Sequence, residues 1–360
     1  MGSAPIKWND KGVEPEVPNE QQKIEQMHNL INKVQEHNFS QHRHGFRGTH
    51  VKTQAIVKGQ LQVASNLSPE LAQGLFGKGG KTFPIAIRYA NEPSWLQDDR
   101  AGAPRGCGMK VFNVDDAGAF LDPTGEETHT QDFTFNNAPI LELTDLPTTV
   151  EIFTLREKYF KENDWETLRA KLKERKDSEL QFAPTQLPNN HFMGYTMYSQ
   201  SAYRFGDYVV KYALFPTGKF QQELGEKAAV NDNSDPEQHS LWLREYFQAN
   251  DAEFDFRVQL CRNLEQQSVE DCSQQWDEEK YPFETVGKVV LPKGQDVFDS
   301  KRRAFWDEQM KLNVWYGLEA HRPLGSANRL RKTLYQASLK KREELNATKV
   351  RAVKSIEEIP

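Results

Sequence analysis

The sequence predicts an α+β fold, in which an antiparallel β-sheet or barrel is surrounded by helices. Three observations support this prediction. Segments with strand patterns crowd the middle of the 360 residues, helical patterns lie toward both ends, and strands and helices do not alternate as they do around a parallel sheet. The chain is long enough to bury a sizeable core, and its sequence shows neither an internal repeat nor an obvious interdomain linker. We therefore expect one main domain.

The first 40 residues predict an arm followed by a helix. Residues 1–18 are rich in proline, glycine and charge. Residues 19–37 carry apolar side chains at the spacing of an amphipathic helix, namely at Ile24, Met27, Leu30, Ile31 and Val34. Such an arm is consistent with exchange between the subunits of a homo-oligomer. We divide the chain into this arm and helix at 1–40 and a single domain at 41–360.

Runs of apolar and β-branched residues, separated by Gly, Asp and Pro clusters, predict the strands. These runs occupy residues 51–63, 84–89, 109–114, 132–135, 194–203, 208–214, 253–261 and 286–291. Gly59 is a candidate bulge in the first run, and residues 204–207 have the composition of a turn. The barrel is therefore expected over about 47–292.

Helical patterns are predicted on either side of these strands and at two places between them. Ser68, Pro69 and Glu70 have the order of a helix start, with a capping hydroxyl, a proline and an acid. Residues 145–175 predict two helices that separate near 162–164. Helical patterns return at 300–312 and from 327 onward, which predicts a helical tail over about 298–350.

The composition excludes several classes of protein. Aromatic residues make up 11% of the chain, which argues against disorder, and the net charge of −6 comes from interspersed charges of both signs. No basic block suggests nucleic acid, and no apolar run predicts a signal peptide or transmembrane segment. The three cysteines (Cys107, Cys261 and Cys272) match neither a disulfide framework nor a zinc site, so we expect a cytoplasmic protein.

The late helix carries a first candidate constellation. Its members share one helical face because they are spaced by four, three and four positions: Arg331, Tyr335, Ser338 and Arg342. A guanidinium one turn before a phenol favours the phenolate, which is a known ligand of ferric haem iron. A second arginine two turns later can reach a carboxylate. A charged surface helix would show the same spacing, so this pattern alone does not decide between the two.

Two further candidates lie in the first half of the chain. His50 follows Arg47 and Thr49 in a polar approach to the first strand, and histidine is the side chain best suited to move a proton near neutral pH. The nearby His42 and His44 lack a carboxylate or cysteine at ligand spacing, which argues against a metal cluster. Asn136 ends an aromatic strand, where its amide either serves a turn or binds a polar ligand.

Taken together and in order, these motifs resemble the catalase superfamily, and most closely its short catalase-related haem proteins. The resemblance runs from about residue 47 to residue 342. It is carried by RxxH (47–50), PIAIR (84–88), RGxxMKVF (105–112), DFxxNNxP (132–139), VGKVVL (286–291) and RxxxYxxSxxxR (331–342). The segment HRPLG (321–325) is similar to the short branch in particular.

The resemblance implies a haem b enzyme on an antiparallel β-barrel. It places His50 and Asn136 on the distal side of the haem, and Tyr335 as the axial ligand of the iron with Arg331 as its hydrogen-bond partner. The propionate-binding arginines correspond to Arg47, Arg88 and Arg342. In the mechanism that this implies, a hydroperoxide binds the iron through one oxygen, and His50 takes its proton and returns it to the leaving oxygen while Asn136 steers.

Several departures from ordinary catalases shape the expected function. Thr49 stands where catalases usually carry Val, as in the allene oxide synthase branch, which acts on fatty-acid hydroperoxides. Ala90 replaces a serine that orients the distal histidine, and Leu141 replaces a phenylalanine over the haem. The long C-terminal part of large catalases does not follow Arg342, which argues against tightly bound NADPH.

We therefore expect an enzyme that cleaves the O–O bond of an organic hydroperoxide, in the first place one of a fatty acid, to give an allene oxide, epoxide or related product. One alternative is a small catalase or peroxidase that uses hydrogen peroxide and oxidises a second organic substrate. Another alternative is a haem-binding protein without catalysis. Simple haem binding needs neither His50 nor Asn136, which argues against this last alternative.

Overall fold

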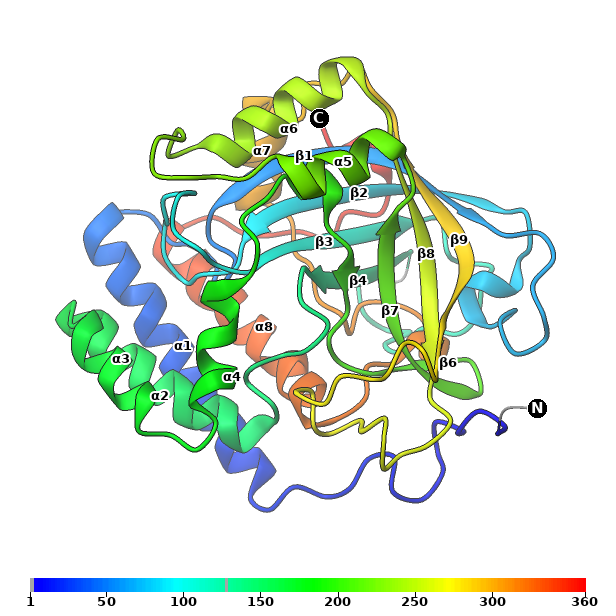
Figure 1. Ribbon diagram of the computed structural model, residues 1–360, viewed down its shortest axis with the longest axis horizontal. Helices are drawn as coiled ribbons and strands as arrows, with labels where there is room; N and C mark the ends of the chain where they lie inside the picture. Colours follow the sequence, from blue (N-terminus) through cyan, green and yellow to red (C-terminus); the bar gives the residue numbers. More distant parts are fainter. Residues whose placement is uncertain (1–2, 127–128) are drawn as a thin grey trace.

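A computed structural model describes residues 3–126 and 129–360 and shows an antiparallel barrel wrapped by helices (Figure 1). The sheet runs in the order β5-β4-β3-β2-β1-β9-β8-β7-β6, and an additional pairing of β5 with β7 closes eight of these strands into a ring. The strands are β1 (Thr53–Val63), β2 (Thr82–Asn91), β3 (Arg105–Phe112), β4 (Thr130–Asn136), β5 (Met197–Tyr198), β6 (Tyr203–Phe205), β7 (Tyr208–Pro216), β8 (Ala252–Leu260) and β9 (Phe283–Leu291). The predicted α+β class is thus confirmed.

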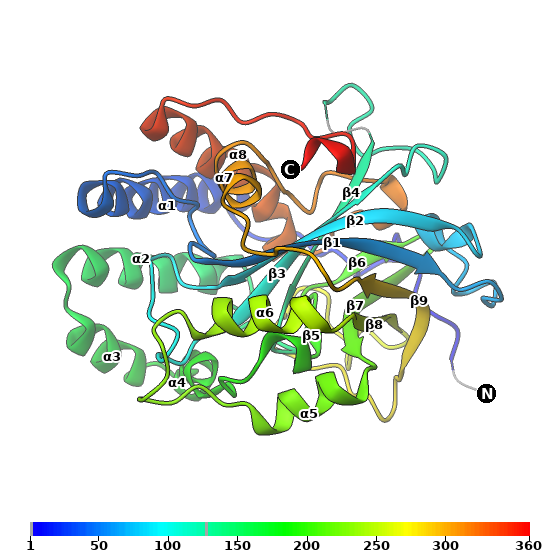
Figure 2. The same ribbon diagram turned by 90° about the horizontal axis from the view of Figure 1, so that it is seen from above.

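The helices form layers outside the barrel (Figure 2). They are α1 (Glu20–His42), α2 (Leu146–Glu162), α3 (Trp165–Lys173), α4 (Ser178–Phe182), α5 (Lys219–Lys227), α6 (Gln238–Ala249), α7 (Ser300–Glu308) and α8 (Ser326–Asn346). The long helices α1, α2 and α8 pack on one another through an apolar cluster, whereas α6 and α7 contact β1. Among the residues described, no helix combines the length and apolar character that crossing a membrane requires.

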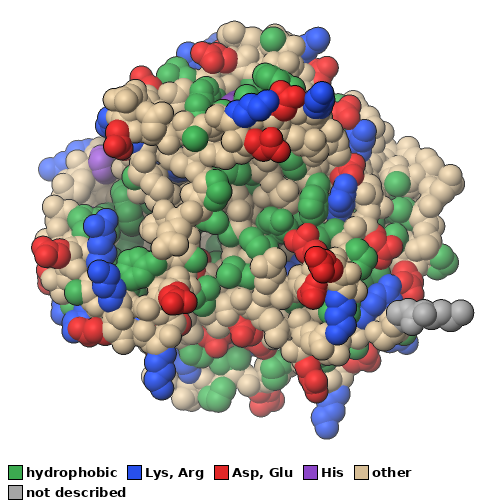
Figure 3. Space-filling view, in the orientation of Figure 1, with side chains coloured by type: hydrophobic (Ala, Val, Ile, Leu, Met, Phe, Trp, Pro, Cys, Tyr) green, Lys and Arg blue, Asp and Glu red, His purple; other side chains and the backbone are tan. Residues whose placement is uncertain are grey.

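The interior of the barrel is filled by side chains. In β2, Ile85, Ile87 and Tyr89 belong to this core, whereas Arg88 and Ala90 line a cavity outside it. The alternation follows from strand geometry, because successive side chains point to opposite faces. Since the interior is packed, a ligand site has to lie on the outer face of the barrel. Figure 3 shows positive and negative side chains interspersed on one face of the molecule, in keeping with the predicted absence of a basic patch.

Most predicted elements are present, but four local predictions are wrong. Residues 68–70 form a turn rather than a helix start, and a 3₁₀ helix (Gly74–Gly77) follows. Gly59 pairs regularly with Ile85, and the irregularity lies between Thr53 and Ala55. A Cβ on Gly59 would lie 2.4 Å from the carbonyl oxygen of Val290, so the glycine serves the close approach of β9.

The other two corrections concern the region after α3 and the end of the first helix. The strand predicted over 194–203 is divided into a 3₁₀ helix (Phe192–Gly194), the two-residue β5 and the start of β6. The first helix continues to His42, so this histidine belongs to the helix rather than to the loop expected around it. The helices α5 and α6, inserted between β7 and β8, were not predicted.

Candidate functional site

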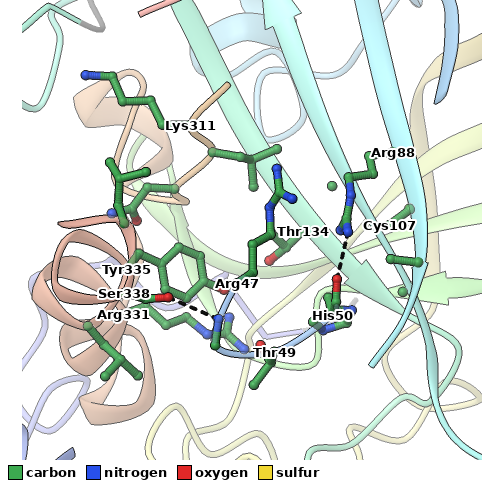
Figure 4. A pocket seen from close by; sticks show the side chains of 18 of the residues that line it. Arg47, Thr49, His50, Arg88, Cys107, Thr134, Lys311, Arg331, Tyr335 and Ser338 are labelled. Atoms are coloured by element: carbon green, nitrogen blue, oxygen red, sulfur yellow. Dashed lines mark hydrogen bonds between the residues drawn. The ribbon is translucent and has the colours of Figure 1, made fainter. Parts of the chain in front are cut away.

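A cavity lies between the outer face of β2–β4 and the helices α1, α7 and α8. Every predicted site residue lines it, from elements far apart in the sequence: Arg47, Thr49, His50, Arg88, Asn136, Arg331, Tyr335 and Arg342. Ala90 lines it as well, whereas Leu141 is not among the lining residues. Figure 4 shows Tyr335 and Arg331 projecting from α8 on one side, with His50 and Arg88 beside the strands on the other.

The backbone around His50 is fixed by contacts on both sides. The amide of His50 donates to the carbonyl of Glu92 at 2.8 Å, and the carbonyl of His50 accepts from the Arg88 guanidinium at 2.7 Å. These bonds hold His50 in a left-handed conformation with φ of 53°, which is uncommon outside glycine. Two residues earlier, Gly48 is required because a Cβ there would lie 2.4 Å from Ile31 on α1.

Gly106 of β3 leaves the space that the imidazole of His50 occupies. Gly106 pairs with Ala90 on one side and with Asn136 on the other, so three small or short side chains adjoin each other. A Cβ on Gly106 would lie 2.5 Å from Cε1 of His50. The imidazole therefore lies directly on the strand backbone, an approach that only glycine permits at this position.

The imidazole of His50 is kept neutral by its surroundings. Burial lowers its pKa to about 3, and the charges of Arg88, Arg331 and Arg47 lower it in the same direction. Its ring makes no hydrogen bond to any residue that the structure describes, Thr49 included. A neutral histidine can accept a proton from a ligand over the whole physiological range of pH.

Asn136 and its neighbour Asn137 differ in what they bind. The side-chain oxygen of Asn137 accepts from the amide of Arg105 at 2.8 Å, which joins the end of β4 to β3. Asn136 is buried, and its side-chain oxygen has no hydrogen-bond partner among the described residues. Because an unpaired buried amide oxygen is costly, it indicates a donor that belongs to a ligand or water.

The predicted face of α8 points into the cavity. Arg331 donates to Ser201 at 3.3 Å and to Asn328 at 3.1 Å, and within the described chain its guanidinium makes no hydrogen bond to Tyr335. Burial acts to lower the pKa of Arg331, but the nearby Tyr335 and Tyr203 raise it above its ordinary value. Arg331 is thus electrostatically coupled to Tyr335, although the expected hydrogen bond is not formed.

Ser338 connects α8 to the loop of His50. Its hydroxyl oxygen accepts a hydrogen bond from the amide of Gly48 at 3.1 Å (Figure 4). This hydrogen bond therefore joins the loop that carries His50 to the helix that carries Tyr335. This contact fixes the distance between the loop at 47–50 and the helix of Tyr335.

Three arginines lie near one carboxylate at an end of the cavity, and two of them bind it. Asp307 on α7 binds Arg47 at 2.8 Å and Arg88 at 3.2 Å. Arg342 donates to the carbonyl of Met310 at 3.1 Å, and its Nε is buried without a partner among the described residues. Burial, and after it repulsion from Arg47, lowers the pKa of both Arg88 and Arg342 to about 9. This excess of positive charge suits a ligand with carboxylates.

A metal held by side chains alone finds no support here. The described residues contain no group of three or more His, Cys, Asp or Glu side chains arranged for a metal ion. His44 instead pairs with Glu308 at 3.0 Å.

No family model matches the sequence, and no curated protein is similar enough in sequence to count as a match. Solved structures, in contrast, resemble the fold over most of this chain. Catalase A from Saccharomyces cerevisiae has a TM-score of 0.56 at 13% identity, and a fungal catalase has 0.56 at 16%. A bacterial catalase has a TM-score of 0.54 at 15% identity. The chain has the catalase fold.

The alignment covers nearly all of this chain but only part of each catalase. The three catalases are matched over 95%, 98% and 94% of this chain, but only 67%, 69% and 63% of their own length is covered. This chain therefore spans about two thirds of those catalases. The resemblance predicted from the motifs is confirmed for the fold, and the activity is argued below as a proposal.

The fold places next to the lining residues other side chains that the sequence motifs did not single out. Asp307 binds two of the three arginines, but in the sequence it is an ordinary acid on an amphipathic helix. Tyr203 is a fully buried phenol near Arg331, and its hydroxyl has no partner in the described chain. The two glycines of β3 left the clearest signal, since glycine inside a strand often marks a close approach.

Proposed function

We propose that this protein is a haem-dependent enzyme of the catalase superfamily that cleaves the O–O bond of an organic hydroperoxide. The observation that carries the proposal is the convergence of all eight predicted residues on one cavity. In particular, the phenol of Tyr335 comes from the helical side, and His50 from the side of the strands (Figure 4). A fatty-acid hydroperoxide is the substrate class that we favour, with an allene oxide, epoxide or related product.

The residues of the cavity fit a haem b group. The unpaired Nε of Arg342 and the excess of guanidinium groups over Asp307 suit two propionates, which Arg47, Arg88 and Arg342 would hold. The phenol of Tyr335 lines the same cavity and would offer an oxygen ligand to the haem iron. When bound, the haem iron supplies the Lewis-acidic and redox centre at which a peroxide bond is cleaved.

The protein's own groups then handle the proton and the substrate's orientation. Neutral His50 accepts the proton of the hydroperoxide at an imidazole nitrogen and delivers it to the departing oxygen. The unpaired amide of Asn136 orients the peroxide. Arg331 places a positive charge near the phenol of Tyr335. A non-catalytic haem carrier would need neither His50 nor Asn136.

The lining of the cavity favours an organic substrate over hydrogen peroxide. Apolar side chains from three helices contribute to it: Ile31, Phe153, Leu334 and Leu339. Ala90 provides no hydroxyl to hold the imidazole, and Thr49 adds a polar group beside it. The alternative, a small catalase or peroxidase acting on hydrogen peroxide, is favoured by the catalase fold itself.

Two assays on the purified protein distinguish these activities. We expect a haem absorption band and rapid loss of the conjugated-diene absorbance of a fatty-acid hydroperoxide, with little oxygen released. Rapid oxygen release from hydrogen peroxide without lipid turnover would favour the catalase alternative. A haem band with neither activity would point to a carrier, and the absence of a haem band would refute all three.

The cellular setting remains a prediction from the chemistry of the chain. All three cysteines are buried and free. We propose a cytoplasmic location on this basis, since a reducing compartment keeps such thiols unpaired. Fractionation of cells that express the protein, followed by immunoblotting, tests it.

A further inference from the structure

A second cavity, of about 620 Å³, lies on the other side of α8 from the first. The N-terminal arm, the start of α1, the segment 315–322 and α8 contribute to it. The two cavities share the wall between them: Arg331 and Tyr335 face the first, whereas Arg329, Lys332 and Thr333 face the second. The proposed function assigns no role to this second cavity.

Cations and indole rings alternate along this cavity. Arg322 stands between two tryptophans, with its guanidinium carbon 5.8 Å from the ring centroids of both Trp8 and Trp315. Arg204 lies 4.3 Å from the ring of Trp8, and the ammonium of Lys332 lies 5.0 Å from the ring of Trp315. The order is therefore Arg204, Trp8, Arg322, Trp315 and Lys332, which we call the cation–indole ladder.

The cations of the ladder have few close carboxylate partners. Glu20 is bound to Arg329, at 2.7 Å. Glu319 also lines the cavity and acts on Arg204 electrostatically, but of the three ladder cations only Arg322 forms an ion pair in the described chain, with Glu14 at 3.7 Å. The Nε of Arg322 is buried and has no hydrogen-bond partner among the same residues. A buried guanidinium nitrogen without an acceptor is costly, so the site favours an anion.

The two rings are held in place by hydrogen bonds outside the cavity. The indole N–H of Trp315 donates to the carbonyl of Asn328 at 2.7 Å, and the amide of Trp8 donates to the carbonyl of Asp207 at 3.0 Å. The amide of Arg204 donates to the carbonyl of Arg322 at 2.8 Å, which joins two rungs of the ladder. A ligand would meet groups that are already positioned, which reduces the entropy lost on binding.

We propose that the second cavity binds a small aromatic anion, that is, a planar ring bearing a carboxylate, sulfonate or phosphate. The anionic group would pair with Arg322, whose fork of donors matches such groups in geometry. The ring would stack against the indole and guanidinium planes of the ladder. An anion without a ring would leave the indoles unused, and a neutral ring would leave Arg322 unpaired.

Calorimetric titration of the full chain with three probes tests whether binding requires both the ring and the negative charge. We expect 2-naphthoate to bind at one site with quenching of tryptophan fluorescence, and both 2-naphthalenemethanol and acetate to bind at least about tenfold more weakly. Equal affinity for naphthoate and the neutral alcohol would overturn the proposal. The titration requires neither peroxide nor turnover, so its outcome is independent of the proposed function.

Three variants locate the binding. Arg322→Gln should weaken naphthoate binding by roughly tenfold to hundredfold because it removes the charge and the fork. Lys332→Gln changes an exposed side chain, so it leaves folding intact and should weaken binding by about threefold. Arg169→Gln, on the exposed surface of α3, is the matched control and should change nothing. Unchanged affinity in both ladder variants would overturn the proposal, because naphthoate would then occupy another part of the molecule.

Discussion

His50 is held in an uncommon backbone conformation so that its ring can lie on Gly106. The left-handed conformation, with φ of 53°, is stabilised by hydrogen bonds to both sides of the residue. Because such a conformation is costly for most side chains, its presence at a cavity indicates a functional constraint on the ring's position. A substitution that tests the proton-transfer role should therefore preserve this backbone.

His50→Asn meets this requirement, since asparagine adopts left-handed conformations more readily than most residues. Asparagine cannot accept a proton near neutral pH, so we expect hydroperoxide turnover to fall by about 10²- to 10⁴-fold. The haem absorption of the purified variant should remain. Steady-state rates and spectra measure both effects. His42→Gln, on an exposed histidine of α1, should leave the rate unchanged.

A substitution at Tyr335 should affect haem binding rather than proton transfer, because the proposed role of Tyr335 is to bind the iron. Tyr335→Phe removes the ligand oxygen while keeping the ring that packs along the cavity. We expect loss of haem or a clearly altered haem spectrum, with a thermal unfolding midpoint close to that of the parent protein. Tyr198→Phe, on β5 and outside this cavity, serves as the control. A parental haem spectrum in Tyr335→Phe would exclude Tyr335 as the axial ligand.

Two glycines of the β3 strand, which have no side chains, leave space on the face that lines the cavity. Gly106 and Gly108 lie two positions apart and so on the same face, toward the cavity. An added Cβ would lie 2.5 Å from His50 at the first position and 2.9 Å from Leu312 at the second. His50 is fixed at its backbone, whereas the contact at Leu312 is the end of a flexible side chain. The two positions should therefore respond differently to alanine.

We expect Gly106→Ala to destabilise the protein by about 1–3 kcal/mol and to lower turnover by displacing His50. Gly108→Ala should cost less and affect turnover less, because Leu312 can change rotamer. Urea unfolding and hydroperoxide assays measure both quantities. Gly77→Ala, where a Cβ would meet only an ordinary contact at 3.4 Å, provides the baseline. Equal effects of all three substitutions would contradict this account of β3.

Periodicity predicted the long elements and missed those that depend on tertiary contacts. The helices at Leu146–Glu162 and Ser326–Asn346 and the strand at Tyr208–Pro216 follow local patterns and were expected. The run at 194–203 is apolar, but the chain needs only two strand residues there to close the barrel. Closure is a property of the whole sheet, so no local pattern indicates it.

The site residues that could be predicted are those that belong to motifs with a characteristic order and spacing. Tyr335 and its neighbours share a helical face, and the motif order indicated that His50 would lie near them. Asp307 was not predictable, because only the fold brings it within 2.8 Å of Arg47. The close approach of the His50 ring to the backbone of Gly106 was not predicted either, because only the fold brings the two together.

At the scale of the whole molecule, α8 separates two cavities of different character. One face of this helix presents Tyr335 to the cavity of the proposed haem site, and the other presents Lys332 to the cation–indole ladder. The helix is joined to the loop of His50 by Ser338 and to the segment 313–316 through Trp315. The arrangement places any ligand of the second cavity one helix diameter from the first, about 10 Å.

Buried titratable groups give the whole fold a defined response to acid. Burial lowers the pKa of His191 to about 4 and that of His321 to about 3. The pKa of His239 is also well below its ordinary value, through burial and then the charge of Arg105. Burial, with a contribution from Glu142, raises the pKa of Glu92 to about 7. The first three groups and the last oppose one another as the pH falls.

The sign of the net effect follows from proton uptake. Between pH 6.5 and about 4 the unfolded chain protonates four histidines that the folded chain keeps neutral, these three and His50, which costs stability. The folded chain binds one extra proton at Glu92 between about pH 7 and pH 4.5, which offsets part of this loss. The balance is about three protons, so the free energy of unfolding should fall by about 4 kcal/mol per pH unit below pH 6.

Urea unfolding at pH 7.5, 6, 5 and 4.5 tests this expectation, with the denaturant slope compared at each pH to show that the same transition is followed. Glu92→Gln is the informative variant, because Glu92 is the one of these five groups that gains a proton on folding. Below pH 6 its stability should fall more steeply than that of the parent, by up to about 1.4 kcal/mol per pH unit. If both proteins kept constant stability from pH 7.5 to pH 5, the buried histidines would have to be protonated in the folded state, and their burial could not control the acid response.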